Sequence, residues 1–114
     1  MRRFSFPITA AILIFAASCA PSGEKINPNL KCSATISAAS HLSSRGLIET
    51  SASFDKQALF SIMMHLNTFA IPNGVREPDA MALLKAHREA LLADTSPSKI
   101  YKEAEACIRK MPGG

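Results

Sequence analysis

Apolar residues recur at intervals of three and four in four stretches of the chain, which is the spacing of one face of an α-helix. The stretches cover residues 28–46, 54–70, 77–94 and 97–111. Alternating apolar and polar residues, the pattern of a half-buried strand, are absent apart from a weak trace near Leu47. We therefore expect an all-α fold, a small antiparallel bundle of three to four helices.

Capping residues mark the start of most of these stretches. Asn27, Ser53 and Ser96 each stand directly before a predicted helix, where a side-chain oxygen can accept a hydrogen bond from a free backbone N–H group. Proline follows Asn27 and Ser96, and proline suits the first helical position. Gly46 and the turn at residues 71–74 end the first two helices.

The apolar faces of these helices predict a core. The second helix carries the strongest face, which consists of Phe54, Ala58, Ile62, Leu66 and Phe69, with Leu59 and Met63 widening it. The faces of the third and fourth helices consist of Ala80, Leu83, Leu84, His87 and Leu91, and of Ile100, Ala104, Cys107, Ile108 and Met111. Phe60 and Met64 fall outside these faces, so they either contact another helix or form an exposed interaction patch.

Four serines of the first helix share a different pattern. They are Ser33, Ser37, Ser40 and Ser44, and helical spacing places them in one stripe. The stripe is either a solvated face or a surface whose small side chains let a second helix approach closely.

The first 18 residues have the organisation of an export signal. Arg2 and Arg3 supply a positive start, an apolar run follows from Phe4 to Ala17, and small residues precede Cys19. The uninterrupted apolar run is shorter than the roughly 20 residues that span a bilayer. We expect cleavage after residue 18, which leaves 96 of the 114 residues in the mature chain.

The residues before Cys19 resemble the signal of bacterial lipoproteins, in which small residues precede an invariant cysteine. Ala16 departs from that pattern, where leucine is commonest. The resemblance implies that Cys19 is acylated and anchors the protein to a membrane, and Ala20 implies sorting to the periplasmic face of the outer membrane. Ordinary cleavage, giving a soluble periplasmic protein, and an uncleaved anchor are the alternatives. Polar, turn-rich residues 19–29 form the lipidated N-terminus and a short tether before the helical domain at 30–112.

Cysteine number fits this assignment. Three cysteines in an exported chain leave one without a partner. If Cys19 carries lipid, Cys32 and Cys107 remain to form a disulfide in an oxidising compartment. A CxxC spacing that would suggest redox or metal chemistry is absent. We therefore expect a Cys32–Cys107 disulfide that joins the first and fourth helices.

Charge gives no sign of a nucleic-acid partner. The chain has 13 basic and 9 acidic residues, and removal of Arg2 and Arg3 with the signal leaves 11 basic residues and a net charge of +2. Basic and acidic residues alternate along the helices instead of forming a basic block. Nucleic-acid binding needs a clustered basic patch, so we do not expect it.

Catalytic and cofactor motifs are also missing. Ser53–Lys56 and Ser96–Lys99 have the Ser-x-x-Lys spacing of penicillin-binding proteins, but the companion motifs of those enzymes are absent. A glycine-rich phosphate loop and a CxxCH haem motif are absent as well. We expect no enzymatic activity and no cofactor.

Histidines are the remaining candidates for ligand chemistry. His41, His65 and His87 fall one on each of the first three helices, which could bring them together around a metal ion. No pair of histidines on one helix has metal-ligand spacing, so packed or boundary histidines are the expectation.

The sequence thus predicts an envelope lipoprotein that binds a protein partner as a subunit, an inhibitor or immunity protein, or a holdase. A metal- or small-ligand-binding protein is the alternative. The disulfide-linked helical plan is similar in outline to that of small periplasmic acid-stress chaperones, although the cysteine spacing and surrounding residues differ.

Overall fold

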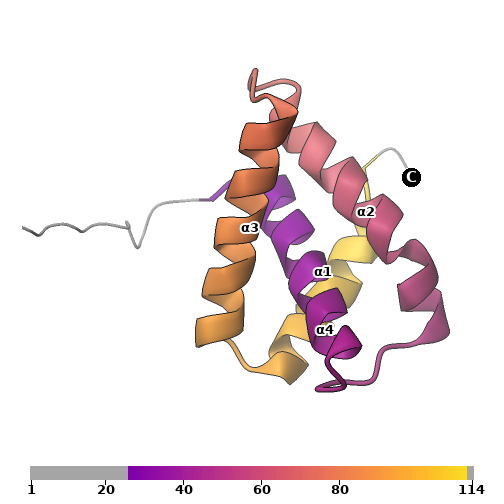
Figure 1. Cartoon of the computed structure of the whole chain (residues 1–114). Helices are drawn as coiled ribbons and strands as arrows, with labels where there is room; N and C mark the ends of the chain where they lie inside the picture. The colour runs from indigo at the N-terminus through magenta and orange to yellow at the C-terminus, as the bar shows by residue number, and fades with distance from the viewer. Residues whose placement is uncertain (1–25, 113–114) are drawn as a thin grey trace, which may run out of the picture.

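The computed structural model describes residues 26–112, so the predicted signal peptide at 1–18 and the predicted lipidation site Cys19 lie outside the described residues. Four helices follow one another: α1 (Pro28–Ser44), α2 (Ala52–Ala70), α3 (Glu77–Asp94) and α4 (Pro97–Arg109). The predicted all-α bundle is confirmed (Figure 1). None of the helices in residues 26–112 is both long enough and apolar enough to cross a membrane.

Capping side chains fix the helix starts. The Asn27 side-chain oxygen accepts from the backbone N–H groups of Asn29 (2.8 Å) and Leu30 (3.3 Å), as the sequence predicts. The prediction for α2 is wrong by two residues, because Ser51 and not Ser53 is the cap and its Oγ accepts from the Phe54 N–H at 3.0 Å.

A long-range contact accounts for the earlier start of α2. The backbone N–H of Ser51 donates to the Tyr101 hydroxyl of α4 at 2.8 Å, which holds Ser51 in the extended conformation that a cap requires. Ser53 therefore lies inside the first turn, where its side chain accepts from Gln57 instead.

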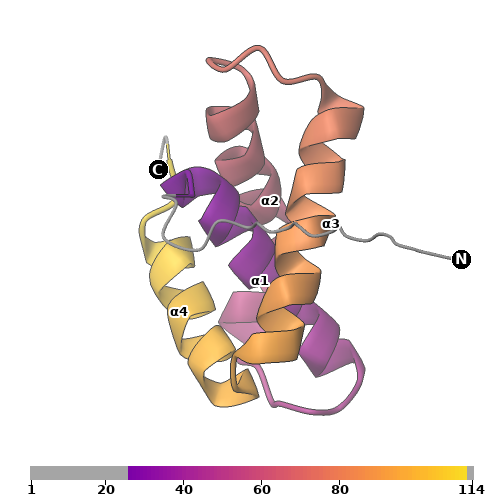
Figure 2. The ribbon, with the colours of Figure 1, turned by 90° about the vertical axis from the view of Figure 1, so that its left-hand side faces the viewer.

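Helix α1 runs through the middle of the domain, with the other three helices packed around it (Figures 1 and 2). It is buried on several sides, since every residue from Cys32 to Ala39 except Ser37 is buried. Helices α2 and α3 converge at the connecting loop and then diverge on either side of α1 (Figure 1). One core cluster joins α1 to α2 and α4 around Ile36, and a second joins Leu30 to α2 and α3.

Small side chains allow α1 to take this central position. Ser33 is fully buried, and its hydroxyl donates to the backbone carbonyl of Ile62 in α2 at 3.0 Å. Ser37 accepts from the Arg88 guanidinium of α3 at 3.3 Å, whereas Ser44 is exposed. The first part of the serine stripe is therefore a helix–helix contact, and only its end is a solvated face.

Enlarging a small residue of α1 should destabilise the domain. Ala38 is fully buried, so Ala38→Leu forces extra methyl groups into a packed core and should lower the free energy of unfolding by about 2 kcal/mol. Ala93→Leu, on the exposed side of α3, is the matched control and should change it by less than about 0.5 kcal/mol. Urea denaturation measures both. Equal stability of the two variants would contradict the central placement of α1.

The predicted disulfide is present. Cys32 near the start of α1 bonds to Cys107 near the end of α4, and their Cα atoms lie 5.4 Å apart. Both cysteines are buried in the first core cluster beside Ile36 and Ala104. The disulfide therefore joins the first and last helices of the domain covalently.

Two of the predicted core positions are wrong. Leu59, expected to widen the buried face of α2, is 72% exposed, and Leu83 of α3 is 40% exposed. Leu59 is exposed because the buried side of α2 near it consists of Phe54, Ala58 and Ser61, which lie about 100° or more from Leu59 around the helix axis. Met63 lies beside Leu59 on the helix and is only half-buried.

Candidate functional sites

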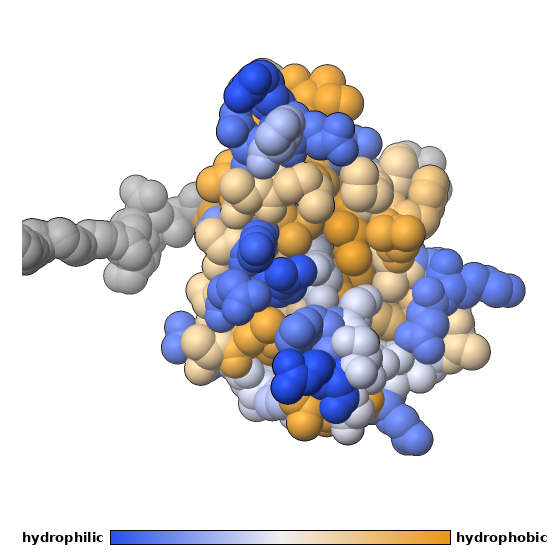
Figure 3. Space-filling model, viewed as in Figure 1, coloured by the Kyte–Doolittle hydropathy of each residue, from blue (hydrophilic) through white to orange (hydrophobic). Residues whose placement is uncertain are grey.

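The outward side of α2 carries an apolar surface. Leu59 is 72% exposed and Phe60 is 60% exposed, and the half-buried Met63 and Met64 follow one helical turn later. Residues at i, i+1, i+4 and i+5 adjoin on one side of a helix, so these four side chains are neighbours. We call them the α2 outer face. Figure 3 shows apolar surface over α2 in this view.

The packing of α2 explains why this face stays uncovered. The helix packs mainly against α1, through an inward side that consists of Phe54, Ala58, Ser61, His65, Leu66 and Ala70. Helices α3 and α4 lie on the flanks of α1 and touch α2 only slightly. The interaction patch that the sequence suggests at Phe60 and Met64 therefore lies at the surface, and Leu59 and Met63 extend it.

His65 is a core residue with both ring nitrogens engaged. It is 2% exposed, and its Nε2 lies 2.9 Å from the backbone carbonyl oxygen of Cys107 in α4. A carbonyl only accepts, so Nε2 donates this hydrogen bond. Its Nδ1 lies 2.9 Å from the side-chain amide of Asn29 in α1, a group that accepts or donates according to which of its ends faces the ring. His65 thus links three helices.

The three histidines do not form a metal site. His41 and His87 are half-buried on α1 and α3, and among residues 26–112 no group of three or more His, Cys, Asp or Glu side chains is placed to hold a metal ion. His65 uses both of its possible ligand atoms within the protein. The arrangement at His65 is that of a packed histidine.

His87 borders a small cavity between α1 and α3. The cavity measures about 200 Å³, and its lining includes Lys31, Leu91 and Asp94. Partial burial lowers the pKa of His87 below its ordinary value of 6.5, because loss of water disfavours the charged ring. His87 is therefore more readily neutral in the folded protein than in the unfolded chain.

This pKa shift predicts a pH dependence of stability. Below about pH 6.5 the unfolded chain takes up a proton at His87 before the folded protein does. The free energy of unfolding should therefore decline as the pH falls through 6.5, and His87→Gln should remove that part of the decline. An NMR titration of the imidazole should give a midpoint below 6.5. A midpoint at or above 6.5 would contradict the burial of His87.

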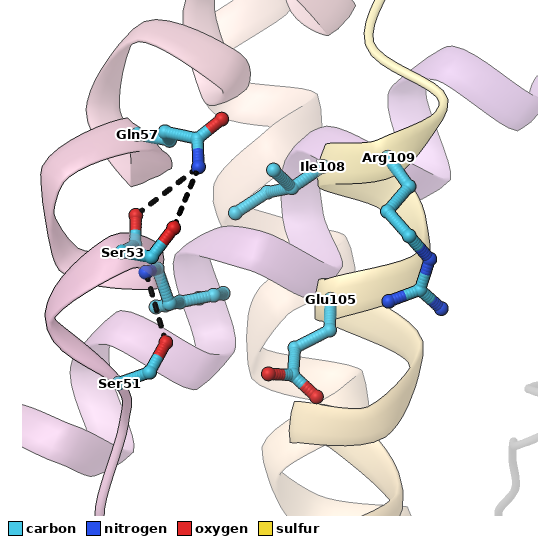
Figure 4. Close-up of a pocket in the computed structure, with 7 residues that line it drawn as sticks. Ser51, Ser53, Gln57, Glu105, Ile108 and Arg109 are labelled. Carbon is cyan, nitrogen blue, oxygen red and sulfur yellow. Dashed lines mark hydrogen bonds between the residues drawn. The ribbon is translucent and has the colours of Figure 1, made fainter.

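A second cavity, of about 140 Å³, lies between the start of α2 and the end of α4 (Figure 4). Its polar side chains are occupied locally: Ser51 caps α2, and the Gln57 amide donates to the carbonyl and the hydroxyl of Ser53. Glu105 and Arg109 line the opposite wall from α4. Lysine and histidine do not line this cavity, and its charged side chains are those of Glu105 and Arg109.

Comparison with protein-family models, with curated proteins and with solved structures gives no match for this chain. The site assignments therefore depend on the residues themselves. Sequence reasoning found Phe60 and Met64 as candidate surface residues but placed Leu59 and Met63 in the core. Helical spacing alone could not have shown this, because Leu59 lies about 20° from the buried Leu66 around the helix axis and about 100° from Phe60.

Proposed function

We propose that the chain is a small envelope lipoprotein that acts by binding a protein partner, with Cys19 as the lipid anchor and the α2 outer face as the contact surface. The exposure of Leu59 and Phe60 is the observation that carries this proposal. Large apolar side chains that cluster at a surface indicate a protein contact, whereas scattered ones do not. Leucine and phenylalanine here adjoin two methionines, and so form a cluster.

The side chains of the α2 outer face suit a helical or extended protein segment. Phe60 supplies a rigid aromatic anchor of the kind that dominates binding energy in interfaces. Met63 and Met64 are flexible and polarizable, so they adapt to the shape of a partner. Lys56 and Asn67 lie on the same outward side, one turn before and one turn after this cluster, and supply a polar rim.

Small-ligand binding receives less support. The cavity at His87 measures about 200 Å³, below the range of roughly 300–1,000 Å³ that is usual for ligand pockets. The cavity at Ser53 is smaller still, at about 140 Å³. The geometry therefore favours binding through the α2 outer face over ligand binding in either of these two cavities.

Site-specific photocrosslinking in intact cells tests the contact. A photoreactive phenylalanine analogue in place of Phe60 should give a discrete protein adduct, which mass spectrometry then identifies. The same analogue in place of Lys85, an exposed residue of α3, is the control and should not give that adduct.

A second variant tests whether the adduct at position 60 depends on the α2 outer face. Leu59→Ser beside the photoreactive residue removes part of the apolar contact and should reduce the adduct at position 60 severalfold. The protein should stay folded, because Leu59 is 72% exposed. The same background pattern from positions 60 and 85 would overturn the α2 outer face as the binding surface.

A further inference from the structure

The outward side of α4 carries a second surface of different chemistry. Lys99, Lys102 and Arg109, together with Lys110 that follows the last helical residue, are all exposed. At about 100° per residue they fall within an arc of about 100° around the helix axis. Lys31 of α1, also exposed, faces Lys110 across the groove between the two helices. We call these five residues the α4 basic face. The structure assembles it from two distant stretches of the chain, so the sequence shows no basic block.

The cations of this face form no ion pair with another described residue. In residues 26–112 the ion pairs are Arg76–Asp79 and Arg88–Glu89, and neither involves the α4 basic face. The surface is also hollowed. One hollow of about 290 Å³ includes Lys31 and Lys110 in its lining, and another of about 620 Å³ includes Lys99, Lys102 and Arg109. The two hollows adjoin, because Glu103 and Ala106 line both.

The chain enters the fold beside this face. Pro28, the first residue of α1, lines the same hollow as Lys31 and Lys110. Cys19 precedes Ile26, the first described residue, by seven positions, and seven residues span at most about 25 Å. An anchor at Cys19 therefore keeps Ile26 within about 25 Å of the bilayer surface, and Pro28, two positions later, lines the hollow that holds Lys31 and Lys110.

We propose that the α4 basic face docks on the anionic phospholipid headgroups of the bilayer that holds Cys19; this rests on the lipid anchor of the proposed function. Lysine and arginine side chains are attracted to an anionic surface within about 8–10 Å at physiological salt, a distance that the short tether allows them to reach. The acyl anchor at Cys19 keeps the domain close to the bilayer, and the α4 basic face determines which side of the domain contacts it.

Two other features agree with this orientation. Helix α3 carries an excess of acidic side chains, with Glu77, Asp79, Glu89 and Asp94 against Lys85 and Arg88. Since two of these carboxylates pair with Arg76 and Arg88, α3 offers an anionic surface less attraction than the α4 basic face does. Among the described residues, the large exposed apolar side chains lie outside α4, so the contact is electrostatic and does not insert apolar groups.

Vesicle sedimentation of the mature chain with Cys19→Ser tests the basic face without the lipid. Residues 26–112 contain all four helices, the disulfide and both core clusters, so this chain holds the complete domain. It should sediment with vesicles that contain phosphatidylglycerol, at low salt, and not with pure phosphatidylcholine vesicles. Each of Lys99→Gln and Lys102→Gln should weaken binding roughly fivefold. Lys85→Gln, on α3, is the matched control and should leave it unchanged.

Replacing Glu103 should change binding to anionic vesicles in the opposite direction. Glu103→Gln removes the carboxylate shared by both hollows and should strengthen sedimentation with anionic vesicles. Circular dichroism confirms that each variant is folded.

Equal binding to both vesicle types, or no effect of Lys99→Gln and Lys102→Gln, overturns the docking proposal. Binding to a DNA duplex at least as tight as to anionic vesicles at the same salt overturns the bilayer as the occupant. Neither result bears on acylation of Cys19, which is measured separately by mass.

Discussion

Replacing both Cys32 and Cys107 with alanine is expected to lower the free energy of unfolding by about 4 kcal/mol. The two cysteines are 75 positions apart, and the disulfide between them restricts the unfolded chain across that whole loop. A small domain has a total stability of about 5–15 kcal/mol, so this loss is a large part of it. The variant should be close to unfolding at 37 °C.

Chemical reduction supplies the matched comparison. Urea denaturation of the unchanged protein in the presence of a reductant should give nearly the same midpoint as the double alanine variant. Because Cys32 and Cys107 are buried with Ile36 and Ala104, the single variant Cys32→Ala leaves an unpaired thiol in the core. It should be at least as unstable as the double variant. Equal midpoints for oxidised and reduced protein would show that the disulfide does not stabilise the fold.

Replacing His65 with alanine is expected to cost about 3 kcal/mol of stability. His65 is 2% exposed and contacts Asn29 and the Cys107 carbonyl, so its removal leaves a cavity and deprives the buried Cys107 carbonyl and the half-buried Asn29 side chain of their partner. Both effects fall at the junction of α1, α2 and α4. Thermal and urea denaturation of the variant measure the loss.

Two conservative variants separate hydrogen bonding from volume. His65→Gln keeps an N–H donor near the position of Nε2 and should recover part of the loss, provided that it still donates to the Cys107 carbonyl. His65→Leu fills the volume but donates no hydrogen bond, so it should be less stable than His65→Gln. The reverse order would mean that His65 acts by packing alone.

The fold was largely predictable from local signals. The spacing of apolar residues and the caps Asn27 and Ser96 gave the helix number and most helix ends, because these depend on neighbouring residues. The start of α2 was not predictable in this way. Ser51 and Ser53 are equivalent as caps within the sequence, and the hydrogen bond from Ser51 to Tyr101, 50 positions away, selects between them.

The central position of α1 was harder to foresee. Its residues are buried on several sides, so its sequence lacks one clear apolar face and resembles a polar helix with a serine stripe. Burial of Ser33 becomes acceptable only when the Ile62 carbonyl is present to accept its hydrogen bond. The identity of that partner is a property of the packed helices.

The candidate surfaces were predictable to different extents. Phe60 and Met64 stood out because they fall off the inward face of α2, a local property. The α4 basic face did not, because Lys31 reaches Lys110 only after α1 and α4 pack together. His65 was expected to be a packed or boundary residue, and its packing against α1 and α4 buries it almost completely.

The intact mass of the protein purified from the membrane fraction of the producing cell tests the central claim most directly. The proposal predicts a chain that begins at Cys19, carries acyl groups on that residue and has Cys32 and Cys107 joined as a disulfide. A protein that retains residues 1–18, or one that begins at Cys19 with an unmodified thiol and is recovered in the soluble fraction, would contradict the assignment as an envelope lipoprotein.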